Sequence, residues 1–134
     1  VHLEEPNAMI EIFKKSNLKY IFFSIPIFSL SVFIENTFKT VAPRHLGAGH
    51  TNLYTKESLY YMAKKYNLDI VGEWWFGADF ADLYRSFIHS SNTTNLKKYK
   101  SELDKNFFSV VNELQNVLDR NKICSEVHVV MKKK

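Results

Sequence analysis

The sequence is poor in cysteine, the residue that builds disulfides and thiolate metal centres. Its single cysteine, Cys124, has no second thiol with which to form an internal disulfide or a zinc site. A reducing, intracellular location follows, and we assign the chain to the cytoplasm. The sequence also contains no glycine-rich phosphate loop, no His-Glu-x-x-His motif and no internal repeat. It therefore predicts no metal site.

A hydrophobic run long enough to cross a membrane is also missing. Residues 20–34 carry no charge, but this run of 15 residues is interrupted by Pro26 and three serines. A spanning helix needs about 20 apolar residues, and the run is not flanked like a signal peptide. We expect a buried strand followed by an apolar loop or a short helix, and no membrane segment.

Positive charge is present in only small excess. The formal net charge is +4, and Lys132, Lys133 and Lys134 supply much of it. Three lysine pairs, at 14–15, 64–65 and 97–98, are on segments that are typical of the solvated faces of helices. The charge pattern therefore predicts no nucleic-acid binding.

The composition and the hydrophobic pattern predict one α/β domain over residues 1–134. With 46% hydrophobic and 15% aromatic residues, the chain can bury one core. The order of the expected elements alternates strands with helices, as in α/β folds. Helices are expected at 6–15, 55–67, 79–88 and 96–120, strands at 18–26, 68–76 and 126–131, an irregular loop at 29–52 and a polar linker at 90–95.

The strand at 18–26 is expected to be buried and parallel. It is apolar on both alternating faces, which is typical of parallel sheets covered on both sides. Pro26 ends it, because proline supplies no N–H to a ladder. Ligands of open α/β sheets bind outside the carboxyl ends of the strands, so residues 24–28 are expected to face a site.

Residues 1–6, 50–59 and 68–71 carry three motifs that resemble those of class I S-adenosylmethionine-dependent methyltransferases, specifically of types 11 and 23. Residues 1–6, Val-His-Leu-Glu-Glu-Pro, resemble the "EHL-x-x-P" end of the family's fourth strand. Residues 50–59 resemble the "H-x-x-x-[YF]-[ST]-x-E-S-L" start of a later helix. Residues 68–71 resemble the "G-F-x-I/V" sixth strand, with Asn67-Leu68 in place of Gly-Phe. The resemblance covers nearly the whole chain, and only loosely over 76–120.

The resemblance implies the C-terminal half of a Rossmann-like sheet. The fifth and sixth strands would be 18–26 and 68–76, and 126–131 would be an antiparallel seventh strand. The family's "E-x-G-x-G" loop and its ribose-binding acid lie upstream of the position of Val1. We therefore expect this chain alone to bind S-adenosylmethionine weakly or not at all and to be inactive. The implied function is methyl transfer to a small-molecule or sugar-like acceptor, with this chain supplying the acceptor side.

Histidines are the candidates for the catalytic base. Methyl transfer to oxygen or nitrogen requires a proton acceptor, and imidazole titrates near neutral pH. The resemblance places His2 beside the cofactor, and His45 and His50 in the loop over the acceptor. Two structural alternatives remain: His50 could brace the turn into the following helix, and His45 could pack within its loop.

Arg44, Tyr54 and Trp75 are candidates for contacts to the acceptor. Arg44 could hold an anionic acceptor or be solvated, and Tyr54 could offer its hydroxyl or close a helix end. Trp75 belongs to an aromatic cluster that could stack on a sugar ring or lie in the core.

A second class of function remains open. A non-catalytic α/β module could use an exposed sheet edge to pair with another chain, because an unpaired strand recruits a partner. A homodimer formed through that edge is the corresponding expectation.

Overall fold

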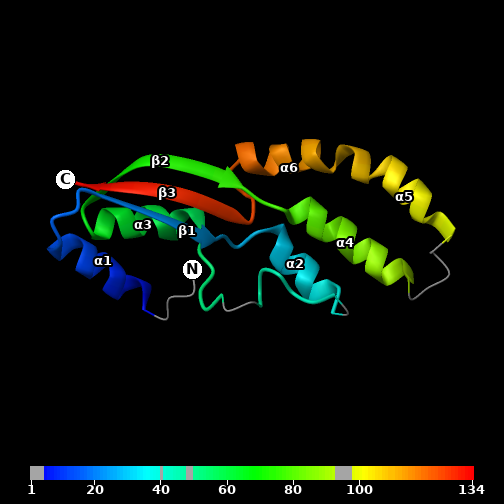
Figure 1. The fold of residues 1–134 in the computed structure, drawn as a ribbon, viewed down its shortest axis with the longest axis horizontal. Helices are drawn as coiled ribbons and strands as arrows, with labels where there is room; N and C mark the ends of the chain where they lie inside the picture. The colour runs from blue at the N-terminus through cyan, green and yellow to red at the C-terminus, as the bar shows by residue number, and fades with distance from the viewer. Residues whose placement is uncertain (1–4, 40, 48–49, 93–97) are drawn as a thin grey trace.

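The computed structural model describes residues 5–39, 41–47, 50–92 and 98–134 and is drawn in Figure 1. His2 lies outside the described residues. In chain order the elements are α1 (Pro6–Lys15), β1 (Tyr20–Pro26), α2 (Leu30–Thr37), α3 (Lys56–Lys65), β2 (Leu68–Phe76), α4 (Asp79–Asn92), α5 (Lys100–Asn106), a 3-10 helix η2 (Phe108–Val110), α6 (Val111–Arg120) and β3 (Glu126–Lys133).

The three strands form one open sheet with β3 in the middle. β3 is antiparallel to both neighbours, so β1 and β2 run in the same direction and end at the same edge of the sheet. In the register, Val129 of β3 is opposite Phe23 of β1 and Glu73 of β2. The protein is therefore a mixed α/β fold with a three-stranded antiparallel sheet, and the predicted α/β class is confirmed. Figure 1 shows α2, α4 and α5 beyond the ends of β1 and β2.

The expectation that β1 is parallel to its neighbour and buried on both faces is wrong for the described residues. Its neighbour β3 is antiparallel, and Tyr20 and Phe22 are 55% and 63% exposed. The buried residues of β1 are Phe23, Ile25 and, at its end, Pro26. The strand has apolar residues on both faces, which is the sequence pattern of a strand that is covered on both sides. In this structure, however, helices cover only one face of the sheet.

The open edge of β1 can be located from its hydrogen bonds. The N–H of Ile27 donates to the oxygen of Ser125 on the β3 side, whereas the oxygen of Pro26 and the N–H of Phe28 pair with Tyr54 on the other side. Because backbone groups alternate along a strand, the N–H groups of Phe22 and Ser24 point to the open edge. The backbone nitrogen of Pro26 also faces the open edge, so the missing N–H of this proline removes no donor from the β1–β3 ladder.

One face of the sheet carries the core. Helices α1 and α3 pack on this face, and the residues of helices and strands form one buried cluster. Its members include Ile10 and Phe13 of α1, Leu59 and Ala63 of α3, and Phe23, Ile25, Val127, Val129 and Met131 of the sheet.

The opposite face, which we call the open face, is aromatic and exposed. The ring of His128 lies 5.4 Å from the ring of Phe22, 5.4 Å from that of Trp74 and 4.5 Å from that of Phe76. Trp74 remains 65% exposed. An α/β sheet normally has both faces covered, so this face is available for further contacts.

Helix α3 has defined ends that follow from its sequence. Thr55 is the N-cap as predicted, and its hydroxyl accepts the N–H of Ser58 while the Ser58 hydroxyl accepts the N–H of Thr55. This reciprocal pair satisfies two backbone donors. After the helix, Asn67 has a φ of 54°. Asparagine tolerates this left-handed conformation better than most residues, so the chain can turn directly into β2.

Two helix predictions need correction. Residues 29–52 are not all loop, because α2 forms within them, with Ser29 accepting the N–H of Ser31 as its N-cap. The helix expected over 96–120 is broken into α5, η2 and α6. At this break Phe107 contacts Phe80 and Phe87 of α4. α4 itself continues to Asn92, beyond the expected start of the linker, and the rest of that linker lies outside the described residues.

Within the described parts of the chain, none of the helices has both the length and the apolar character needed to cross a membrane.

Candidate functional site

Polar side chains gather where β1 and β2 end, and we call this group the carboxyl-edge cluster. α2 starts directly after β1, α4 starts directly after β2, and the chain enters β3 beside them. Because the two strands run in the same direction, these starts lie at one edge of the sheet. The members of the cluster are Ser29, Ser31, Glu35, Arg44, His45, Asp79, Asp82, Gln115, Ser125 and Glu126.

Asp79, at the start of α4, is fully buried and accepts five hydrogen bonds. Its Oδ1 accepts from the Ser29 hydroxyl at 2.6 Å and from the N–H and hydroxyl of Ser31 at 3.1 and 2.8 Å. Its Oδ2 accepts from Gln115 at 3.2 Å and from the N–H of Ser125 at 3.0 Å. Burial alone would raise the pKa of Asp79, but the hydrogen bonds from Ser29, Ser31 and Gln115 outweigh it and lower the pKa.

Gly77 makes room for this arrangement. A Cβ added there would lie 2.5 Å from the Asp79 Oδ2 and 2.8 Å from the Ser125 nitrogen. Because no side-chain carbon fits at these distances, glycine is required where β2 leads into α4.

Arg44 joins the loop before α3 to α4 and β3. Its Nε and Nη2 each lie 2.9 Å from Oδ2 of Asp82, and its Nη1 lies 2.9 Å from Oε1 of Glu126. Burial alone would lower the pKa of Arg44, but its hydrogen bond and charge interaction with Asp82, together with those of Glu126, raise it. Two carboxylates therefore already hold this guanidinium in the position where an anionic acceptor would have to bind.

Glu35, which the sequence analysis did not single out, holds the backbone of the same loop. Its carboxylate accepts the N–H groups of Arg44 at 2.8 Å, His45 at 2.6 Å and Leu46 at 2.7 Å. The sequence contained a signal for this role, because Glu35 is the only charged residue between positions 20 and 38. A lone charge in an apolar segment needs partners when it is buried.

The structure brings His45 and His50 together, with ring centroids 5.9 Å apart. His45 is fully buried, and its Nε2 lies 2.8 Å from the carbonyl oxygen of Ile27, so Nε2 carries the proton. Its Nδ1 is buried and has no hydrogen-bond partner among the residues that the structure describes. His50 places Nδ1 at 2.9 Å from the carbonyl oxygen of His45. In its neutral form, His50 therefore carries its lone pair on Nε2.

Tyr54 lies at the same edge, where its backbone pairs with Pro26 and Phe28. Burial raises the pKa of the Tyr54 hydroxyl. Tyr54 also lines a hollow of about 290 Å³ together with Asn7, Asn52 and Tyr61. A mixture of tyrosine rings and amide groups suits a ligand that carries both a ring and hydroxyls.

Trp75 does not join this edge. It is buried in the core cluster, and its indole N–H donates to Oε2 of Glu73 at 3.0 Å. Lys122 forms an ion pair with the same carboxylate, and its ammonium lies 5.8 Å from the centre of the indole ring. Of the residues predicted to contact the acceptor, the structure thus groups Arg44 and Tyr54 with the two histidines and holds Trp75 apart.

The part of the chain that the structure describes contains no group of three or more histidine, cysteine or acidic residues that could hold a metal ion.

The thiol of Cys124 is expected to be unreactive in the folded protein. Burial raises its pKa to about 12, and the residue has no exposed surface. Thiolate is the reactive form, so a maleimide reagent should label the native protein negligibly and label it fully after unfolding in guanidinium. Mass spectrometry of both samples measures this directly. Equal labelling rates with and without guanidinium would contradict it.

Comparison of the sequence with models of known protein families gives no match, and comparison with curated proteins gives none either. The proposals below therefore depend on the motifs, the strand directions and the geometry of the carboxyl edge.

Proposed function

We propose that this chain is the acceptor-side half of a class I S-adenosylmethionine-dependent methyltransferase. The observation that carries the proposal is the direction of the strands. The resemblance assigns β1, β2 and β3 to the fifth, sixth and seventh strands of that family and implies an antiparallel seventh. β1 and β2 run in the same direction and β3 runs opposite to both.

Several motif residues support the proposal because they have local structural roles. In the segment that resembles "H-x-x-x-[YF]-[ST]-x-E-S-L", Tyr54 bridges the end of β1, and Thr55 and Ser58 form the capping pair. Leu59 is fully buried in the core. Asn67, which stands where the sixth-strand motif has glycine, adopts the positive φ that glycine favours.

The described residues do not fit the cofactor by themselves. A sulfonium cation with a ribose needs carboxylate acceptors, but the carboxylates at this edge are already engaged. Asp79 accepts five hydrogen bonds, and Asp82 and Glu126 hold Arg44.

The contribution of this chain is then to bind the acceptor and remove its proton. We assign the base to Nε2 of His50, since the contact with the His45 carbonyl fixes the proton on Nδ1. His45 is the positioning residue, because it is buried and its carbonyl orients the His50 ring. The hollow beside Tyr54 is suited to a small or sugar-like acceptor.

The test compares two proteins. One is this chain, and the other is a longer polypeptide that contains this chain together with the sequence encoded before it in the same reading frame. Calorimetric titration with S-adenosylhomocysteine should show saturable binding to the longer polypeptide. The Kd of this chain alone should be at least ~100-fold higher, which corresponds to ~2.8 kcal/mol of lost binding free energy at ~1.4 kcal/mol per tenfold. The longer polypeptide should transfer tritium from labelled S-adenosylmethionine to an acceptor. The substitution His50→Gln in that polypeptide should lower kcat strongly and change KM less. A longer polypeptide that neither binds the product nor transfers methyl groups refutes the proposal.

The open edge of β1 favours a second candidate function, which is pairing with a second copy of the chain. Between Tyr20 and Pro26 the strand has no charged residue and no bulge. The other outer strand, β2, has a register shift between Ile70 and Gly72 and carries Asp69 and Glu73. Bulges and charges protect a strand edge from pairing, so of the two outer strands β1 is the one open to a partner.

Replacing Ser24 with proline should abolish such a dimer without disturbing the fold. The N–H of Ser24 faces the open edge, so the β1–β3 ladder keeps all its donors. Sedimentation equilibrium should show dimers for the unchanged chain and for the control Ser24→Thr, and monomers for Ser24→Pro. A monomeric unchanged chain at millimolar concentration, or a Ser24→Pro variant that still dimerises, would argue against edge pairing.

A further inference from the structure

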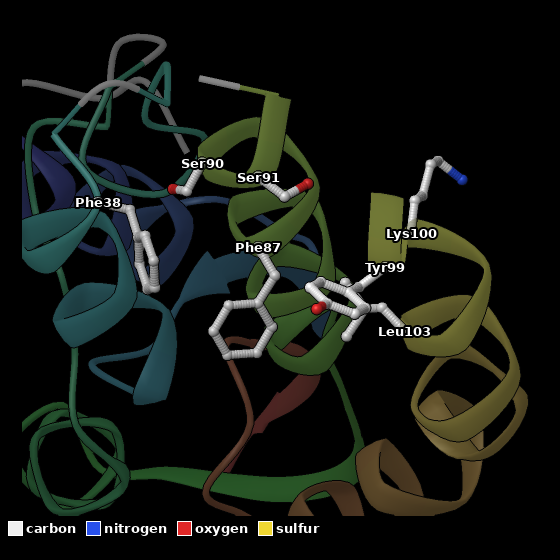
Figure 2. Close-up of a pocket in the computed structure, with 7 residues that line it drawn as sticks. All are labelled: Phe38, Phe87, Ser90, Ser91, Tyr99, Lys100 and Leu103. Carbon is white, nitrogen blue, oxygen red and sulfur yellow. The ribbon is translucent and has the colours of Figure 1, made fainter. Parts of the chain in front are cut away.

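A cavity of about 430 Å³ lies at the end of α4 that is remote from the sheet. Figure 2 shows its walls, which come from three elements: Phe38 follows α2, Phe87 and Ser90 are on α4, and Tyr99 and Leu103 are at the start of α5. At ~1.5 Å per residue, Phe87 is about 12 Å along α4 from Asp79. The cavity is therefore separate from the carboxyl-edge cluster.

Three aromatic residues line the cavity: Phe38, Phe87 and Tyr99. The Phe38 and Phe87 rings have centroids 5.7 Å apart at an interplanar angle of 89°. Figure 2 shows them projecting from α2 and α4, with the Tyr99 ring on the α5 side. Phe87 is 38% and Tyr99 52% exposed, so these rings have free surface for a ligand. Aromatic rings attract another ring by offset stacking and edge contacts, in addition to the gain from burial.

The charges at the cavity favour a neutral ligand. Among the described lining residues there is no carboxylate, and Lys100 is the only charged one. Its ammonium lies 2.7 Å from the carboxylate of Asp104, so its charge is already balanced. A charged ligand would lose its hydration here without gaining a partner.

The volume limits the size of the ligand. At ~30 Å³ per molecule, the cavity has room for on the order of 14 waters, which corresponds to a small organic molecule. From the size, the rings and the balanced charge we propose that this cavity binds a neutral aromatic molecule of one or two fused rings. The inference does not rest on the proposed methyl transfer.

Indole is a suitable probe because it is neutral, bicyclic and aromatic. Calorimetric titration of the full chain should give one site for indole. An indole carboxylate should bind at least ~10-fold more weakly because of its charge, and hexanol at least ~10-fold more weakly because it has no ring. Equal or tighter binding of the carboxylate would overturn the neutral class, and equal binding of hexanol would overturn the aromatic class.

Two blocking variants locate the binding. Ser90→Trp fills the cavity from α4, and Leu103→Trp fills it from α5, so each should reduce indole affinity at least ~10-fold. The matched control is His89→Trp, which adds the same ring at the neighbouring exposed position and should leave the affinity unchanged. Circular dichroism reports whether each variant is folded. Absence of indole binding to the unchanged chain, or unchanged affinity in a folded blocking variant, overturns the proposal, whatever the outcome with S-adenosylhomocysteine.

Discussion

Replacing Asp79 with asparagine is expected to lower the free energy of unfolding by about 3 kcal/mol, because at least two buried donors lose their acceptor. The amide nitrogen of the new side chain cannot accept a hydrogen bond. If it takes the place of Oδ2, the N–H of Ser125 and the Gln115 side chain are left without that oxygen. If it takes the place of Oδ1, the groups of Ser29 and Ser31 are affected instead. Denaturant titration of both proteins measures the difference.

The matched control for this variant is Asp69→Asn. Asp69 is on β2, and its ion pair with Lys134 is at 3.4 Å between side chains that are about half exposed. Such a pair contributes about 0.5 kcal/mol or less. Equal losses of stability in the Asp69 and Asp79 variants would mean that the buried hydrogen bonds of Asp79 are not a major source of stability.

The stability of the unchanged protein should also fall in acid partly through Asp79. Its pKa is lowered in the folded state, so the unfolded state binds a proton first as the pH decreases. This contribution is present above the ordinary carboxyl pKa of ~3.9 and is lost as the pH falls through the lower folded value. The Asp79→Asn variant should show a shallower decrease in stability below about pH 4, and an unchanged slope would contradict this assignment.

Replacing Glu35 with glutamine is expected to lower the free energy of unfolding by about 2 kcal/mol, because an amide cannot accept all three N–H groups of the loop. Arg44, His45 and Leu46 each donate to this carboxylate. Hydrogen exchange should show faster exchange at these three amides than at those of α3. This variant should also reduce any catalysis that depends on His50, since the His45 carbonyl holds that ring.

Glu11→Gln is the control for Glu35, because Glu11 is exposed on α1. It should leave stability within about 0.5 kcal/mol of the unchanged protein. Protection of the loop amides that survives in Glu35→Gln would show that contacts other than the carboxylate hold the loop.

The sequence was sufficient to predict elements whose signals are local. The strand at 68–76 and the helix that starts after Thr55 have the predicted positions, because hydrophobic periodicity and capping residues depend on neighbours in the chain. The break at Phe107 was not predictable in this way. The stripe of apolar residues over 96–120 is compatible with one helix, and the contacts of Phe107 with α4 come from the tertiary fold.

The carboxyl-edge cluster was predicted only in part for the same reason. His45 and Tyr54 both lie against residues at the end of β1, and the resemblance had put His45 in the loop over the acceptor. The partners of Asp79 are not local, since Ser29 lies 50 positions earlier in the chain. Burial of Trp75 likewise depends on which face of the sheet the helices cover, and the alternation of residues in β1 did not reveal this.

The central position of β3 has a consequence for synthesis on the ribosome. Both β1 and β2 pair with β3, and the described strands include no pair between β1 and β2. The hydrogen-bonded ladder between Phe23 and Val129 therefore cannot form until Val129, about 100 residues later in the chain, has been synthesised. Until residues 126–133 have left the exit tunnel, β1 and β2 lack their common partner, so chaperone binding during translation should be strongest in that interval.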